Sequence, residues 1–288
     1  MGRLTAIDGG LFTTIQDSGR PGYRKFGVPV SGVMDQKSFR LANWLVGNSK
    51  RYPVLECTMK GGKYTFNDEA IIAVTGALMH PKINGEEVPQ NQSLKLNTGD
   101  ELELGFSTRG CRSYIAIKGS LTIKQVMGSC STYTMGKFGG FKGRKLKSGD
   151  VIEWDETKSK DLTRKAPYDQ IPYFSSKVRV RIMKGVEWDW LSEESQDGFS
   201  GTQFEVSSSS NRMGIRLEGH SLRVPEREMI SGPVLPGIIQ LPPNGNPIIL
   251  MQDGQTIGGY PRIAKVLDED LWRLGQVKPG DKVSFSFT

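Results

Sequence analysis

The sequence of 288 residues has only two histidines and three cysteines. With His80 and His220 alone, a metal site built from several histidines is excluded. Cys57, Cys111 and Cys130 contain no Cys-x-x-Cys pair, and an odd number of cysteines does not make a disulfide framework. We therefore expect reduced thiols, a cytoplasmic location and no bound metal ion.

Long hydrophobic runs are also missing. No stretch of eighteen apolar residues occurs, and Arg3 and Asp8 interrupt the residues that follow Met1. A membrane-spanning helix needs about 20 apolar residues, and a secretory signal needs an apolar segment near its start. The sequence therefore predicts neither a membrane span nor a signal peptide.

Motifs of several common enzyme classes are absent. The chain has no G-x-x-x-x-G-K-[ST] phosphate loop, no G-x-S-x-G elbow and no Met-Lys-Met biotin acceptor. A formal charge of +7 is also found in proteins that bind nucleic acid, but net charge is more direct evidence about solubility than about the choice of partner. We predict no nucleic-acid partner and no cofactor bound by this chain.

Glycine is abundant, with 35 residues and no collagen-like period, and many tight turns suit a β protein. Apolar or alternating runs predict strands at Ala70–Val74, Glu101–Phe106, Tyr114–Ile117, Val178–Met183, Ile248–Met251 and Val283–Phe287. Helix patterns are few and fall at Asp35–Val46, Glu187–Ser195 and Asp268–Leu274. The chain is predicted to be mainly β, built of barrels or sandwiches with a few short helices.

Two kinds of internal similarity predict two halves. GVPVSGVMD at 27–35 is similar to GPVLPGIIQ at 232–240, and LNTGDEL, LKSGDVI and VKPGDKV begin at 96, 146 and 277. Each Gly-Asp unit predicts a turn that needs glycine, followed by a strand. We expect a first half at 1–156, a non-periodic linker at 157–177 and a second half at 178–288.

The segment 13–35, TTIQDSGRPGYRKFGVPVSGVMD, concentrates charge among glycines and prolines. Arg20 and Arg24 offer planar forks for a carboxylate, and Gln16 and Asp17 lie beside them. One interpretation is a binding loop in which Asp17 orients an arginine or accepts a proton. The other is a surface turn with an ordinary Asp17–Arg20 salt bridge.

A second polar loop, MQDGQTIGGYPR at 251–262, follows the apolar strand IILM. Its polar side chains suit recognition of a polar, planar small molecule: Gln252, Asp253, Gln255, Thr256, Tyr260 and Arg262. The alternative is a plain connection that turns at Gly258-Gly259. The preceding segment 230–246 has four prolines and three glycines and predicts a rigid structural wall beside such a pocket.

These motifs resemble the biotin-dependent carboxyltransferase family. The resemblance is carried by the segment 10–48, AVTGA at 73, GCRSYIAIKGS at 110 and GSCST at 128. It continues through SNRMGIRLEG at 210, the segment 230–266 and the closing LGQVKPGDKVSF, and so covers nearly the whole chain. The family includes allophanate hydrolase subunit 2, the KipA proteins and the C subunit of bacterial 5-oxoprolinase.

The resemblance implies two related cyclophilin-like β-barrel halves. It implies a C-type chain of an ATP-dependent 5-oxoprolinase, which hydrolyses 5-oxoproline to glutamate together with an A-type subunit and a smaller, KipI-like B-type subunit. ATP would be used by the complex, and biotin enters only by family analogy. Two alternatives stay open: a KipA-type regulator that binds a KipI-like inhibitor, and the carboxyltransferase part of a urea carboxylase.

Within the enzyme interpretation, the two loops are expected to face one pocket that holds a small amide or lactam. Asp17 or Asp253 would act as acid or base, since no histidine serves. Arg20, Arg24 and Arg262 would hold a carboxylate. The amides would orient the scissile carbonyl: Gln16, Gln252 and Gln255. Thr256 and Tyr260 are also expected to bind the substrate.

Overall fold

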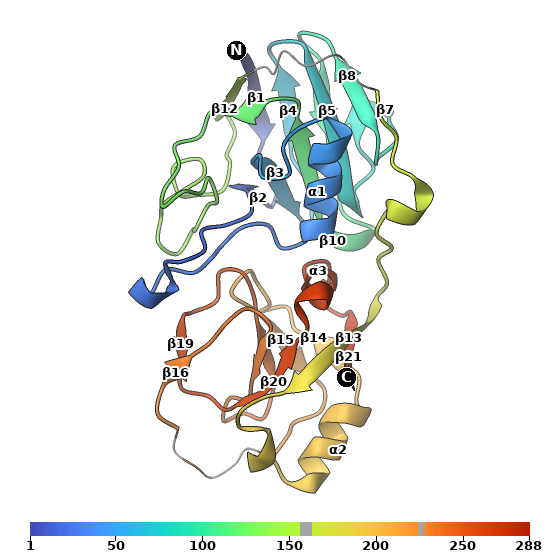
Figure 1. Cartoon of the computed structure of the whole chain (residues 1–288). Helices are drawn as coiled ribbons and strands as arrows, with labels where there is room; N and C mark the ends of the chain where they lie inside the picture. The colour runs from blue at the N-terminus through green and yellow to red at the C-terminus, as the bar shows by residue number, and fades with distance from the viewer. Residues whose placement is uncertain (156–162, 224–226, 228) are drawn as a thin grey trace. The chain divides into compact units, whose positions relative to one another are not determined.

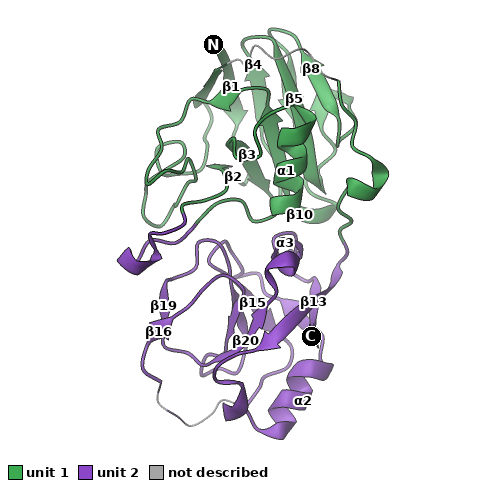
Figure 2. Cartoon of the chain, in the orientation of Figure 1, with its two compact units in different colours: residues 1–20, 31–174 green, residues 21–30, 175–288 purple. Residues whose placement is uncertain are grey.

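The computed structural model describes residues 1–155, 163–223, 227 and 229–288. The chain forms two compact units, one of residues 1–20 and 31–174 and one of residues 21–30 and 175–288 (Figure 2). Of the predicted linker, residues 157–162 lie outside the described residues, and residues 163–174 belong to the first unit. The glycine-rich segment 21–30 belongs to the second unit.

The first unit contains two antiparallel sheets (Figure 1). One has the order β11 (Ser120–Leu121), β12 (Val151–Asp155), β1 (Gly2–Asp8), β4 (Lys63–Phe66), β9 (Glu101–Glu103), β6 (Lys82–Ile83), β7 (Glu86–Glu87). The other has the order β2 (Phe12–Gln16), β3 (Val54–Thr58), β10 (Arg109–Ile117), β5 (Ala70–Leu78), β8 (Ser93–Leu96). Side chains from both sheets share one core, in which Phe66 packs on Trp154 and Ile115 is buried with them.

Helix α1 (Gln36–Leu45) covers the face of the second sheet along β5 and β10 (Figure 1). Its apolar side packs Phe39 and Leu45 against Tyr114 in a second core cluster. Asp35 caps its first turn by accepting hydrogen bonds from the backbone N–H groups of Lys37 and Ser38. The predicted helix is therefore confirmed, and Asp35 is its N-cap.

The second unit is a closed barrel. Its strand order is β13 (Lys177–Lys184), β20 (Arg262–Val266), β17 (Ile238–Gln240), β18 (Ile248–Leu250), β15 (Gly214–Glu218), β14 (Phe204–Val206), β21 (Lys282–Phe287). The parallel pairing of β13 with β21 closes the barrel. A separate ribbon pairs β16 (Gly232–Pro233) with β19 (Ile257–Gly258).

Short helices occur in both regions where they were predicted, around 187–195 and 268–274, and two more, at Arg24–Phe26 and Tyr168–Gln170, were not predicted. They are η1 (Arg24–Phe26), η2 (Tyr168–Gln170), η3 (Trp188–Trp190), α2 (Glu193–Gly201), η4 (Asp268–Asp270) and α3 (Leu271–Leu274). The predicted continuous helix over Glu187–Ser195 is wrong, because the backbone is extended at Leu191 and Ser192. Ser192 accepts a hydrogen bond from the N–H of Ser195 and thereby starts a new helix.

The three Gly-Asp sequences adopt the same turn. Gly99, Gly149 and Gly280 have φ values of 91°, 83° and 87°, a region that favours glycine. In each turn the aspartate carboxylate accepts from the N–H three residues earlier: Asp100 from Asn97, Asp150 from Lys147 and Asp281 from Lys278. The turns lead into β9, β12 and β21, so the predicted turn-then-strand units are confirmed.

The predicted mainly β architecture with a few short helices is confirmed, including a closed seven-stranded barrel. Cys57, Cys111 and Cys130 are free and buried. Among the described residues, none of the helices has the length and apolar character needed to cross a membrane.

Candidate functional site

A polar pocket of about 460 Å³ lies on the outer face of the barrel in the second unit. Ile215, Ile239 and Ile249 point into the barrel and are fully or almost fully buried. Their neighbours along the same strands face the other way and line the pocket: Gly214, Arg216, Gln240, Ile248 and Leu250. The pocket floor is therefore the outward surface of β15, β18 and β17.

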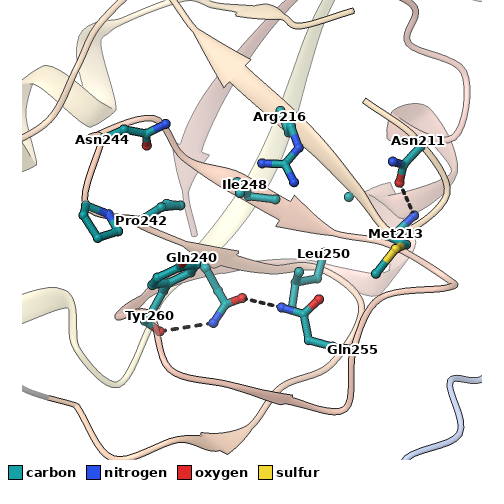
Figure 3. Close-up of a pocket in the computed structure, with 12 residues that line it drawn as sticks. Asn211, Met213, Arg216, Gln240, Pro242, Asn244, Ile248, Leu250, Gln255 and Tyr260 are labelled. Atoms are coloured by element: carbon teal, nitrogen blue, oxygen red, sulfur yellow. Dashed lines mark hydrogen bonds between the residues drawn. The ribbon is translucent and has the colours of Figure 1, made fainter. Parts of the chain in front are cut away.

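Three adjacent strands place Arg216, Ile248 and Gln240 side by side. In the sheet register, Ile248 is paired with Arg216 on one side and with Gln240 on the other. Neighbouring strands are about 4.8 Å apart, so the backbones of Arg216 and Gln240 are about 10 Å apart. A guanidinium and an amide thus flank an apolar side chain on the same surface (Figure 3).

The rim of the pocket is formed by residues of the loops that flank β15, β17 and β18. Pro242, Pro243 and Asn244 connect β17 to β18, and Asn211 and Met213 precede β15. The two prolines fix the local backbone, which agrees with the predicted rigid wall. Gln255 and Tyr260 complete the lining from the loop after β18 (Figure 3).

A chain of amide hydrogen bonds orients the side of the pocket nearest this loop. Gln255 donates from Nε2 to Oε1 of Gln240 at 3.1 Å, and Gln240 donates from Nε2 to the backbone oxygen of Tyr260 at 3.2 Å (Figure 3). Gln240 is buried. A Cβ at Gly258 would lie 2.5 Å from Nε2 of Gln240, so a larger residue at this position would displace the Gln240 amide from its present place.

Asp253 lies just before this part of the loop in a buried ion pair. Its carboxylate accepts from Nε and Nη2 of Arg212 at 2.8 and 3.1 Å. The backbone N–H of Asp253 also donates to the carbonyl of Arg212 at 2.9 Å. These contacts join the loop to the start of β15, and Asp253 is not part of the pocket lining.

Arg262 is also engaged in an ion pair. Its guanidinium donates to Glu187 at 2.6 and 2.9 Å, and it also contacts the carbonyl of Pro233 at 3.2 Å. Hydrogen bonding to Arg262 lowers the pKa of Glu187, although burial opposes that shift. Gln252 and Thr256 are half-buried and lie outside the pocket lining.

Arg24, from the segment 21–30, acts on the same loop. Its guanidinium donates to the backbone oxygens of Val234 and Gln255, the latter at 3.0 Å. Burial lowers the pKa of Arg24. Within the described parts of the chain, this arginine has no carboxylate partner, and it holds the backbone of a residue that lines the pocket.

The first loop forms a buried hydrogen-bond network in the first unit. Oδ1 of Asp17 accepts from Ser129 Oγ at 2.6 Å, Ser131 Oγ at 2.5 Å and the N–H of Gly19 at 2.8 Å. Oδ2 accepts from the N–H of Cys130 at 2.6 Å. Four donors thus surround this carboxylate and connect the loop to GSCST at 128–132.

Gln16 and Arg20 lie in the same unit and are fully buried. Gln16 donates to Thr14 Oγ1 at 3.0 Å, and Arg20 donates to the carbonyl of Ser131. The Arg20 guanidinium also lies over the ring of Phe138, 5.1 Å from its centroid. These contacts of Arg20 are with residues of its own unit.

Of the ten predicted site residues, Gln255 and Tyr260 line the pocket, and Arg24 supports it. That the first loop faces this pocket stays a prediction. Sequence reasoning missed Arg216 and Gln240, although both lie in segments that carried the family resemblance. Among the described residues, the structure contains no cluster of His, Cys, Asp or Glu suited to a metal ion.

A family model for the carboxyltransferase domain, subdomain A and B, matches residues 26–287. The chain belongs to this family, as its motifs predicted. It is 38% identical over 283 residues to the C subunit of 5-oxoprolinase from Escherichia coli (strain K12), covering 98% of this chain and 90% of that protein.

The chain is also similar to part of much longer proteins. Urea amidolyase of Lachancea kluyveri is 36% identical over 301 residues, which cover 96% of this chain and 16% of that protein. The crystal structure of the K. lactis urea amidolyase superposes with a TM-score of 0.93 at 33% identity, over 98% of this chain and 18% of that one. This chain therefore spans about a sixth of the urea amidolyases it matches.

Proposed function

We propose that this chain is the C-type subunit of a 5-oxoprolinase, a complex that hydrolyses 5-oxoproline to glutamate. One observation carries the proposal: the similarity to the E. coli C subunit runs almost from end to end of both proteins. A second 5-oxoprolinase C subunit, from Haemophilus influenzae, is 33% identical over 94% of this chain and 87% of its own length. The relatives are named as subunits, so the activity belongs to an assembly.

The pocket on the barrel supports a role in binding a small polar substrate. It presents amide, phenol and guanidinium groups over an apolar floor, as small-molecule sites do. ATP is proposed to be bound and used by another subunit, because this chain has no phosphate-loop motif. The proposed partners are an A-type subunit and a smaller, KipI-like B-type subunit.

The test is reconstitution from purified subunits. The chain is mixed with the A-type and B-type subunits, ATP and 5-oxoproline, and glutamate and ADP are measured. Glutamate is expected only when all subunits and ATP are present. Formation of glutamate at the same rate without this chain would overturn the proposal and would leave a regulatory, KipA-like role if the chain still binds the B-type subunit.

A second candidate function is the carboxyltransferase step of a urea carboxylase. It is favoured by the crystal structure of the Kluyveromyces lactis urea carboxylase, which superposes with a TM-score of 0.93 and is 33% identical. In that case the chain would receive a carboxyl group from carboxybiotin carried on another protein. Urea in place of 5-oxoproline, with ATP, bicarbonate, a biotin carboxylase and its biotin carrier, distinguishes the two: only this candidate predicts ATP consumption that depends on both urea and this chain.

A further inference from the structure

Among the described residues that line the pocket, Arg216 is the one that carries a guanidinium. Its side chain is exposed on β15 and, among the residues that the structure describes, makes no ion pair or side-chain hydrogen bond. Among the described residues, four other arginines of the barrel unit are paired with carboxylates: Arg181 and Arg273 with Asp270, Arg212 with Asp253 and Arg262 with Glu187. The positive charge of Arg216 is thus available to a ligand, and a guanidinium fork suits a carboxylate.

The opposite side of the pocket offers the amides of Gln240 and Gln255, and the backbone of Gln240 is about 10 Å from that of Arg216. Oε1 of Gln240 accepts from Gln255, so the orientation of both amides is defined. Among the described residues, the carbonyl oxygen of the Gln255 side chain accepts no hydrogen bond. A primary amide with a free oxygen and a second N–H complements a lactam, which has one N–H and one carbonyl.

The floor between these two sides is apolar. Ile248 lies between Arg216 and Gln240 in the sheet register, and Leu250 lines the same surface. A small ring with methylene groups would cover Ile248 while its polar ends reach the two sides. The cavity of about 460 Å³ is within the usual range for small-molecule sites.

We propose that this pocket binds a small cyclic amide that carries a carboxylate, with Arg216 holding the carboxylate and Gln255 the ring amide. This inference rests on the proposed function for the identity of the ligand, which is then 5-oxoproline. Arg216 is a specificity-determining residue here, because it distinguishes the acid from a neutral lactam of the same ring size. The amide chain from Gln255 to Gln240 positions the ring.

The experiment compares Arg216→Ala with Arg179→Ala. Arg179 is a matched control, because it is also an exposed arginine on a strand of the same barrel but does not line the pocket. Binding of 5-oxoproline and of 2-pyrrolidinone, which lacks the carboxylate, is measured by ligand-observed NMR on the full chain. The KM for 5-oxoproline is measured in the reconstituted complex.

Arg216→Ala is expected to weaken 5-oxoproline binding on the order of tenfold or more, since hydrogen bonds to charged groups are among the stronger ones. Arg216→Lys is expected to restore part of the loss, and Arg179→Ala to resemble the wild type. The wild type should prefer 5-oxoproline to 2-pyrrolidinone, and Arg216→Ala should lose that preference. A rise in KM with kcat retained would show that Arg216 acts through binding.

The two proposals fail in different ways. If the complex makes glutamate and Arg216→Ala has the same KM as Arg179→Ala, the pocket inference is overturned and the function stands. If no glutamate forms but the chain binds 5-oxoproline in an Arg216-dependent way, the function fails and the pocket inference stands. Equal binding of 5-oxoproline by Arg216→Ala and Arg179→Ala in that case overturns both.

Discussion

Asp253 accepts two hydrogen bonds from the guanidinium of Arg212, at 2.8 and 3.1 Å, and both side chains are buried. Loss of one partner from a buried ion pair leaves the other charged and uncompensated. The pair therefore holds the loop after β18 to the start of β15, next to the pocket.

Asp253→Ala is expected to lower the free energy of unfolding by about 3–5 kcal/mol, because it leaves Arg212 buried without its carboxylate. Urea denaturation monitored by tryptophan fluorescence measures the change. Asp253→Asn keeps the shape of the side chain, so it separates the role of the carboxylate in the ion pair with Arg212 from a role as acid or base. If Asp253 were an acid or base alone, Asn would abolish turnover at wild-type stability.

Arg24→Ala is expected to loosen the loop that carries Gln255. The variant loses the hydrogen bonds to the carbonyls of Val234 and Gln255, which contribute about 1–3 kcal/mol together. Hydrogen–deuterium exchange should increase in residues 253–260, and the KM for 5-oxoproline should rise in the complex. Lys25→Ala, an exposed neighbour, is the control. Unchanged exchange in this loop would contradict the supporting role of Arg24.

Replacement of the aspartate by asparagine is expected to change the free energy of unfolding differently in two of the Gly-Asp turns. Hydrogen bonding to Arg144 lowers the pKa of Asp150, whereas burial raises the pKa of Asp281. Asp150→Asn is expected to cost about 1 kcal/mol at neutral pH, since the charged partner Arg144 remains. Asp281→Asn is expected to be neutral or stabilising, because the ionised form of Asp281 is the disfavoured one in the folded state.

The pH dependence follows from the direction of each shift. Because the folded-state pKa of Asp150 is lowered, its stabilisation is present above the ordinary value of 3.8 and is lost as pH falls through the folded value. The stability difference between wild type and Asp150→Asn should therefore shrink below about pH 4. Thermal unfolding across this range measures it, and a difference that grows on acidification would refute the assignment.

The cysteines are expected to resist alkylation in the folded protein. Burial raises the pKa of Cys57 and of Cys130 to about 11, and all three thiols are buried. The thiolate is the reactive form, so iodoacetamide at about pH 8 should leave the native chain unmodified. Intact mass spectrometry should show three additions after unfolding in urea. Rapid labelling of Cys130 without denaturant would show that its site opens.

The site was only partly predictable, because some of its residues are close together in the sequence and others are far apart. The loop 251–262 was recognised because its polar side chains are adjacent in sequence, and Gln255 and Tyr260 do line the pocket. Arg216 and Gln240 escaped because each lies in a short strand that looks ordinary on its own. The predicted helix over Glu187–Ser195 was broken by a local restart at Ser192, which the apolar pattern did not reveal.

The β-rich character, the Asp35-capped helix and the three Gly-Asp turns could be predicted from the amino-acid order, because they depend on backbone preferences and contacts within a few residues. Strand pairing was needed to set Arg216, Ile248 and Gln240 side by side, since it brings together residues that are distant in the chain. Folding also pairs Asp253 with Arg212, which lies 41 residues earlier in the sequence. Chemistry that depends on such distant partners has no local signal in a single sequence.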